Sequence, residues 1–89
     1  MAQHLNAALR KAIGQRLREL RLRAGISSQA SLAEESGVHR TYVGRLERGE
    51  SGVTVDSLAA ILAALDVSLN EFFKPFKDVV RTSTPRRRT

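Results

Sequence analysis

Three arginines, a threonine and a glycine share one side of a short stretch near the middle of the sequence. These residues are spaced i, i+1, i+4, i+5 and i+8, and they are Arg40, Thr41, Gly44, Arg45 and Arg48. In a helix this spacing forms one polar face, with Val43 and Leu46 on the opposite side. Arginine can bond two acceptors on a guanine edge or clamp a phosphate, and threonine can meet a thymine methyl. The pattern predicts a surface for nucleic acid, although an ordinary solvated helix face carries the same residue types.

Two short helices are predicted to present this face. Ser28 can cap the first of them, and the second covers about residues 39–48 and ends at Gly49. The tight turn between them is Glu-Ser-Gly-Val at 35–38. A glycine-containing turn between short helices is typical of a helix-turn-helix, whose second helix enters the major groove of DNA. Gly44, which has no side chain, is expected to let the backbone of that helix approach the groove floor.

A long helix is predicted before this pair. An apolar stripe at steps of three and four residues marks it, and Gly25 is expected to end it. Gly14 falls inside the stripe and is expected to weaken the helix slightly. The stripe consists of Leu5, Leu9, Ile13, Leu17, Leu20 and Ala24.

Two more helices are predicted after the pair, which makes the chain all-α with five helices. Thr54 is a plausible cap for the fourth helix. The capping-box spacing of Ser68 and Glu71 predicts a short fifth helix that ends before Pro75. The inward face of the fourth helix consists of Leu58, Ile61, Leu62 and Leu65.

Length and charge restrict the classes of protein to consider. The chain has 89 residues, no cysteine and a net charge of +6, which fits one domain over residues 1–80 and a disordered basic tail over 81–89. Residues 1–48 carry nine Lys/Arg against four acids, whereas residues 49–80 carry two against five. This asymmetry fits one surface for a polyanion and another for protein, although solubility alone would also account for it.

Other kinds of function find little support in the sequence. No apolar run is long enough for a membrane span, and we expect a soluble cytoplasmic protein. His4 and His39 are too few for a metal site, and no set of nucleophile and base is recognisable. We therefore expect no enzyme activity, no metal, no cofactor and no small-molecule ligand.

Residues 28–49 resemble the lambda-repressor-like, XRE/Cro-type helix-turn-helix family. The shared motifs are Ser-Gln-x-x-Leu-Ala, Gly-Val, Arg-Thr-Tyr and Arg-Leu-Glu-Arg-Gly, in that order and at the family's spacing. The resemblance extends over roughly residues 10–73. It implies a compact five-helix domain that binds operator DNA.

The resemblance also implies roles for individual residues. Arg40, Thr41 and Arg45 match positions that contact bases. Arg21 and Glu47 match a structural ion pair between the first helix and the recognition helix. Gln29, at the start of the second helix, is expected to steady the recognition helix as well as to touch a phosphate. The positions expected to contact the DNA backbone are Gln29, His39, Tyr42 and Arg48.

The chain departs from the family pattern in two places. One extra residue lies between Gly25 and Gln29, so the cap of the second helix is Ser27 or Ser28. His39 stands where Ser or Thr is more usual, which predicts a weaker cap for the recognition helix.

Dimerisation is expected because one subunit reads too little DNA. Helix-turn-helix dimers place two recognition helices about one DNA turn apart on a near-palindromic site. The clustered phenylalanines offer an interface, since Phe72 and Phe73 are about 100° apart on a helix and cannot easily fill one small core. Alternatively, all the phenylalanines close the core of the monomer. The expected interface residues are Leu69, Phe72, Phe73 and Phe76.

The expected function is therefore that of a homodimeric transcriptional regulator that binds double-stranded DNA in a sequence-specific manner. The run from Arg40 to Leu58, with Glu71-Phe72-Phe73 after it, resembles controller proteins of restriction–modification systems, which implies a stand-alone dimer that controls its own operon. A phage-type repressor or an antitoxin has similar features. A protein-interaction module that no longer binds DNA is the alternative of a different class.

Overall fold

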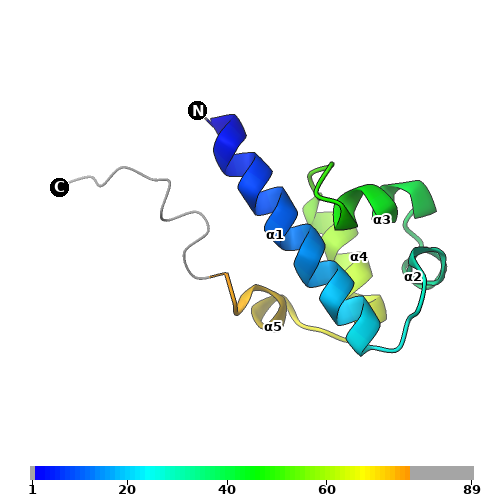
Figure 1. Cartoon of the computed structure of the whole chain (residues 1–89). Coiled ribbons are helices and arrows are strands. Elements are labelled where there is room, and N and C mark those ends of the chain that lie inside the picture. The colour runs from blue at the N-terminus through cyan, green and yellow to red at the C-terminus, as the bar shows by residue number, and fades with distance from the viewer. Residues whose placement is uncertain (1, 77–89) are drawn as a thin grey trace.

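The computed structural model describes residues 2–76, and side chains from residue 7 onward. Within this range the chain forms five helices and no strand, as the sequence predicts (Figure 1). The helices are α1 (Ala2–Arg23), α2 (Gln29–Ser36), α3 (Arg40–Glu47), α4 (Val55–Leu65) and α5 (Leu69–Phe73). The predicted basic tail at 81–89, the domain boundary at residue 80 and the Leu5 side chain lie outside the described residues.

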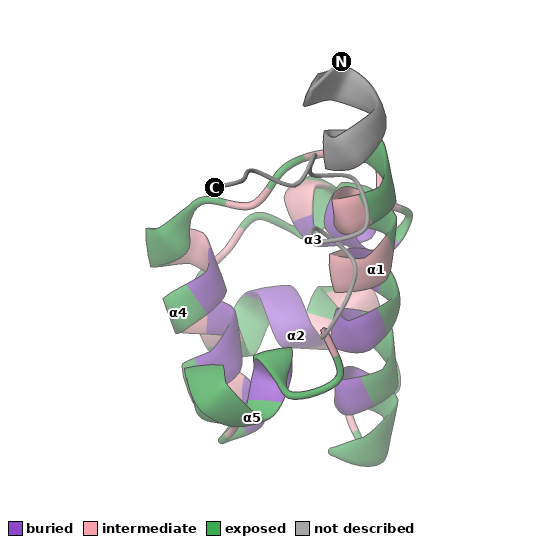
Figure 2. Ribbon diagram, turned by 90° about the vertical axis from the view of Figure 1, so that its left-hand side faces the viewer, coloured by how far each residue is buried: buried purple, intermediate pink, exposed green. Residues whose placement is uncertain are grey.

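One hydrophobic core joins all five helices (Figure 2). It is built from apolar residues whose spacing follows the helical period, as amphipathic helices require. Its members are Leu17, Leu20, Leu32, Ala33, Val43, Leu46, Leu58, Ile61, Leu62, Leu65 and Phe72. Ala24, predicted at the end of the α1 stripe, is exposed instead, because α1 ends at Arg23 and the chain turns away there.

The helix boundaries follow local hydrogen bonds. Ser28, not Ser27, caps α2 by accepting a bond from the Ser31 amide at 3.0 Å. Thr54 and Ser68 cap α4 and α5 through the amides three residues ahead, also at 3.0 Å. Gly37 ends α2 in the left-handed region with φ of 77°, where a side chain would be strained. These caps place the helix ends within one residue of the predicted positions.

The structure of residues 2–76 contains no helix that is both long and apolar enough to cross a membrane.

Candidate nucleic-acid interface

Helix α3 turns its basic side away from the core. Arg40, Thr41 and Arg45 are exposed, whereas Val43 and Leu46 are each only 1% exposed on the opposite side. The amphipathic pattern of the sequence therefore corresponds to the actual orientation of the helix. No salt bridge involves Arg40 or Arg45 among the residues that the structure describes. Their guanidinium groups form a positive surface that can accept an anionic partner.

Gly44 does not lie on this exposed surface. It is buried, and a Cβ built on it would lie 3.0 Å from Gln29 Oε1 and 3.2 Å from a terminal nitrogen of Arg48. The expectation that Gly44 lets the backbone approach a groove is therefore wrong. The missing side chain instead leaves room for Gln29 of α2 to lie across α3.

The predicted ion pair between Arg21 and Glu47 holds α3 against α1. Arg21 donates to both carboxylate oxygens of Glu47, from Nε at 2.7 Å and from Nη2 at 3.0 Å. The two side chains are 5% and 2% exposed. Arg21 also donates to the Ile26 carbonyl, and Gln29 donates to Glu47 Oε1 at 3.0 Å. A buried pair with these additional bonds fixes the orientation of α3 more than it adds net stability.

Gln29 lies where the resemblance implies, at the start of α2, and its bond to Glu47 fits the expected role of steadying α3. Its amide nitrogen is engaged by Glu47, and the residue is half-buried between α2 and α3. Gln29 thus joins the start of α2 to Glu47 of α3. A contact of Gln29 with the DNA backbone would therefore position both helices.

The two ends of α3 hold the remaining predicted backbone contacts. His39 caps α3, because its ring Nδ1 accepts a bond from the Thr41 amide at 3.2 Å. The hydroxyl of Tyr42 donates to the Gly52 carbonyl at 3.1 Å and accepts from the Thr54 amide at 3.4 Å. It therefore ties α3 to the loop that leads to α4. Arg48 is exposed beyond the carboxyl end of α3 and forms an ion pair with Glu50 at 3.1 Å.

Gly14 is essential to the position of α3, although the sequence indicated only a weak point in α1. A Cβ at this position would fall on the carbonyl oxygen of Leu46 and lie 2.7 Å from that of Glu47. The backbone of α1 therefore touches the carboxyl end of α3 directly. A glycine on the inward face of an amphipathic helix signals such an approach, but it does not say which element approaches.

Helix α5 divides the phenylalanines between the core and the surface. Phe72 is 0% exposed, so the prediction that it lies in a dimer interface is wrong. Its side chain is surrounded by the monomer's own core. Leu69 and Phe73 are 52% and 38% exposed. Phe76 is half-buried, and the centroid of its ring lies 5.6 Å from that of the Phe72 ring, in a stacked arrangement. Of the four predicted interface residues, only Leu69, Phe73 and part of Phe76 are available to a partner.

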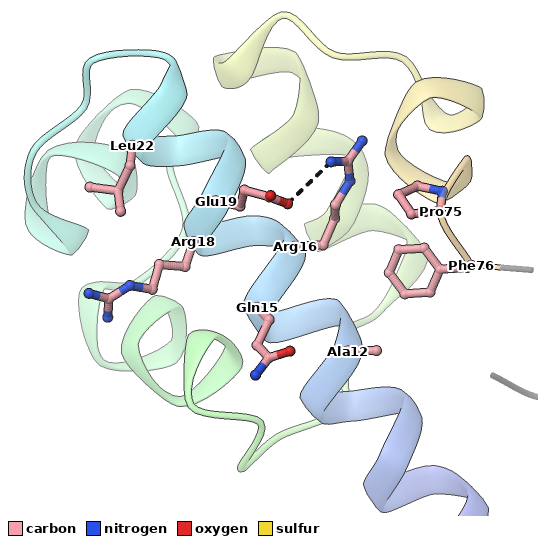
Figure 3. A pocket seen from close by; sticks show the side chains of 8 residues that line it. All are labelled: Ala12, Gln15, Arg16, Arg18, Glu19, Leu22, Pro75 and Phe76. Atoms are coloured by element: carbon pink, nitrogen blue, oxygen red, sulfur yellow. Dashed lines mark hydrogen bonds and ion pairs between the residues drawn. The ribbon is translucent and has the colours of Figure 1, made fainter.

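Arg16 of α1 secures α5, a contact that the sequence did not reveal. This buried guanidinium donates to the carbonyls of Phe72 at 3.0 Å and Glu71 at 2.8 Å, and to the Glu19 carboxylate at 3.3 Å. Beside it, a shallow groove of about 440 Å³ lies between α1 and Pro75-Phe76 (Figure 3). The signal in the sequence is an arginine beside the apolar stripe of α1, three residues after Ile13 and one before Leu17.

The described residues contain no group of three or more His, Cys, Asp or Glu side chains that could hold a metal ion.

Comparisons with known proteins agree with this arrangement. Residues 17–72 match the helix-turn-helix family. The chain is 41% identical over 59 residues to the control protein C.BamHI of Bacillus amyloliquefaciens, and this alignment covers 66% of the chain and 73% of the relative. It is 50% identical over 42 residues to the control protein C.SmaI of Serratia marcescens, which covers 47% and 50% of the two chains.

A solved structure is similar over most of the described residues. The crystal structure of the restriction–modification controller protein C.AhdI from Aeromonas hydrophila has a TM-score of 0.70 and 44% identity. The match covers 74% of this chain and 98% of that protein. The arginine-lined α3, the turn that precedes it and these similarities lead to one conclusion: the chain belongs to the helix-turn-helix family of DNA-binding domains.

Proposed function

We propose that this protein is a dimeric, sequence-specific transcriptional regulator that places α3 in the major groove of a near-palindromic operator. The observation that carries the proposal is the exposed face of α3, where Arg40, Thr41 and Arg45 point away from the core. Arginine recognises the O6 and N7 atoms of guanine through two parallel hydrogen bonds. Arg40 and Arg45 are the residues we assign to guanine edges.

The surroundings of α3 fit a helix that must be held at a constant angle to the duplex. Arg21 and Gln29 both bond to Glu47, and Gly14 lets α1 touch the end of α3. A side chain reads a base only from the correct position. A fixed orientation of α3 therefore favours direct readout of bases. We assign Gln29, His39 and Arg48 to the phosphates that flank the groove, and also Tyr42, whose hydroxyl would exchange the Gly52 carbonyl for a phosphate oxygen.

A dimer follows from the size of the base-reading surface. Two bidentate arginines supply roughly 2–6 kcal/mol of discrimination, at about 1–3 kcal/mol each. Specific binding typically exceeds nonspecific binding by roughly 4–10 kcal/mol. A second subunit doubles the contribution and brings it into that range. The exposed Leu69 and Phe73 of α5 are the apolar surface that we assign to the partner subunit.

The relatives suggest the genetic role. C.BamHI and C.SmaI are control proteins, and C.AhdI is a restriction–modification controller protein. We infer that this chain serves as a controller in a restriction–modification system.

The test begins by selecting bound sequences from a random DNA pool. Arg40→Ala and Arg45→Ala should each weaken binding to the selected operator by about 1–3 kcal/mol, with a smaller change on random DNA. Arg23→Ala is the matched control, because Arg23 is an exposed arginine at the far end of α1. Equal losses on both DNAs would refute base reading by Arg40 and Arg45. If the wild-type protein shows no salt-dependent DNA binding, the protein-interaction alternative replaces the proposal.

A further inference from the structure

Helix α1 extends well beyond the part of the chain that matches the family. The family match begins at residue 17, whereas α1 begins at Ala2. In Figure 1 the amino-terminal half of α1 (blue) continues past the carboxyl end of α3 rather than ending beside it. This half therefore adds surface next to the recognition helix that residues 17–72, the range of the family model, do not include.

The added surface lies against the loop that leaves α3. A Cβ built on Gly49 would lie 2.9 Å from Lys11 Cγ and 3.0 Å from its Cα, so the loop backbone touches α1 at this residue. The loop also passes Arg10, whose Cδ would be 3.9 Å from a Cβ on Gly52. Arg10 and Lys11 thus adjoin the residues that directly follow α3.

Two positive charges at this point have no counterion within the part of the chain that the structure describes. Lys11 is exposed, and among the described residues neither Lys11 nor Arg10 takes part in a salt bridge. The nearby acid Glu50 is engaged by Arg48 at 3.1 Å. The Nε atom of Arg10 is buried with no hydrogen-bond partner among the described residues. This local surplus of positive charge favours an anionic partner.

We propose that Arg10 and Lys11 form an additional contact with the DNA phosphate backbone beside the groove occupied by α3, an inference that rests on the proposed DNA-binding function. The widths of a helix and of the major groove support contact with the DNA backbone rather than base reading. A helix with its side chains is about 10–12 Å wide and fills a major groove about 12 Å wide. Side chains that lie beside α3, as those of Arg10 and Lys11 do, are therefore placed to contact the phosphates that border the groove. Such contacts raise affinity on any sequence and add no specificity.

The experiment measures salt dependence, because each phosphate contact releases condensed counterions. The slope of log K against log[salt] is negative, and each lost contact makes it shallower by about 0.9 for duplex DNA. Between about 50 and 200 mM salt, Lys11→Gln should therefore lose about 3.5-fold less affinity than the wild type, and the double variant Arg10→Gln/Lys11→Gln about 12-fold less. At low salt both variants should bind more weakly than the wild type, by the same factor on the selected operator and on random DNA.

Two control variants test whether the effect comes from the positive charge at Lys11 itself. Arg23→Gln removes one positive charge from the exposed surface at the other end of α1 and should leave the slope unchanged. Lys11→Arg keeps the charge and should restore the wild-type slope. Circular-dichroism melts verify that each variant is folded at the temperature of the titration.

The outcomes separate this inference from the proposed function. An unchanged slope for Lys11→Gln and the double variant, with Arg40→Ala still defective on the operator, overturns the α1 contact and leaves the function intact. A loss confined to the operator also overturns it, since that result means base recognition. Absence of DNA binding by the wild type overturns the proposed function itself.

Discussion

Replacing Gly14 by alanine tests how closely α1 and α3 approach. Helix propensity alone favours the change by about 1 kcal/mol, because glycine is a poor residue inside a helix. The structure predicts the opposite sign. The new Cβ would fall on the Leu46 carbonyl and lie 2.7 Å from the Glu47 carbonyl. These are backbone atoms, so α3 must move as a whole.

The magnitude follows from the two opposing effects. Overpacking a tightly packed contact costs about 1–3 kcal/mol, and we expect the upper end because no flexible side chain can move aside. After the propensity gain is subtracted, Gly14→Ala should lower the free energy of unfolding by about 2 kcal/mol. For a domain of this size that corresponds to a decrease in Tm of about 8–16 °C.

Urea denaturation followed by circular dichroism measures this loss, with all proteins at the same concentration because a dimer's stability depends on it. Gly44→Ala is the matched control, since it introduces the same side chain into another helix. There the new Cβ meets the ends of two flexible side chains, Gln29 and Arg48, at 3.0 and 3.2 Å. Its stability should stay within about 1 kcal/mol of wild type. A Gly14→Ala protein as stable as the wild type or more stable would refute the direct contact between the two helices.

Four other substitutions address separate contacts. Glu47→Gln leaves the buried Arg21 without its counterion and should destabilise the fold by about 3–5 kcal/mol in urea denaturation; unchanged stability would mean that the pair is solvated. Arg16→Gln removes the hydrogen bonds to the last carbonyls of α5 and should lose about 1–3 kcal/mol, with faster amide hydrogen exchange in α5; wild-type protection of α5 would contradict the proposed support. Phe73→Glu should shift sedimentation from dimer to monomer while the helical circular-dichroism signal is retained, whereas Phe72→Ala should cost about 3–5 kcal/mol of stability. A dimer that persists in Phe73→Glu would exclude this face of α5 as the interface.

Helix boundaries and the exposed basic face were predictable because they depend on short distances along the chain. The caps by Ser28, Thr54 and Ser68 each accept a bond from an amide three residues away. The outward orientation of Arg40 and Arg45 follows from the helical period, which places Val43 and Leu46 on the other side. The Arg21–Glu47 pair joins residues 26 positions apart. It was expected only from the family resemblance, since no local rule relates the two residues.

The contacts between helices could not be derived in this way. The role of Gly14 depends on the carboxyl end of α3 reaching it, and Gly44 faces Gln29 because α2 packs on that side. Arg16 finds its partners in carbonyls of α5 that lie 55 and 56 residues away. Phe72 and Phe73 are chemically identical neighbours, yet one fills the core and the other remains partly exposed. The spacing of residues shows which side of a helix is apolar, but the distance and rotation between packed helices depend on how all the side chains fill the common core.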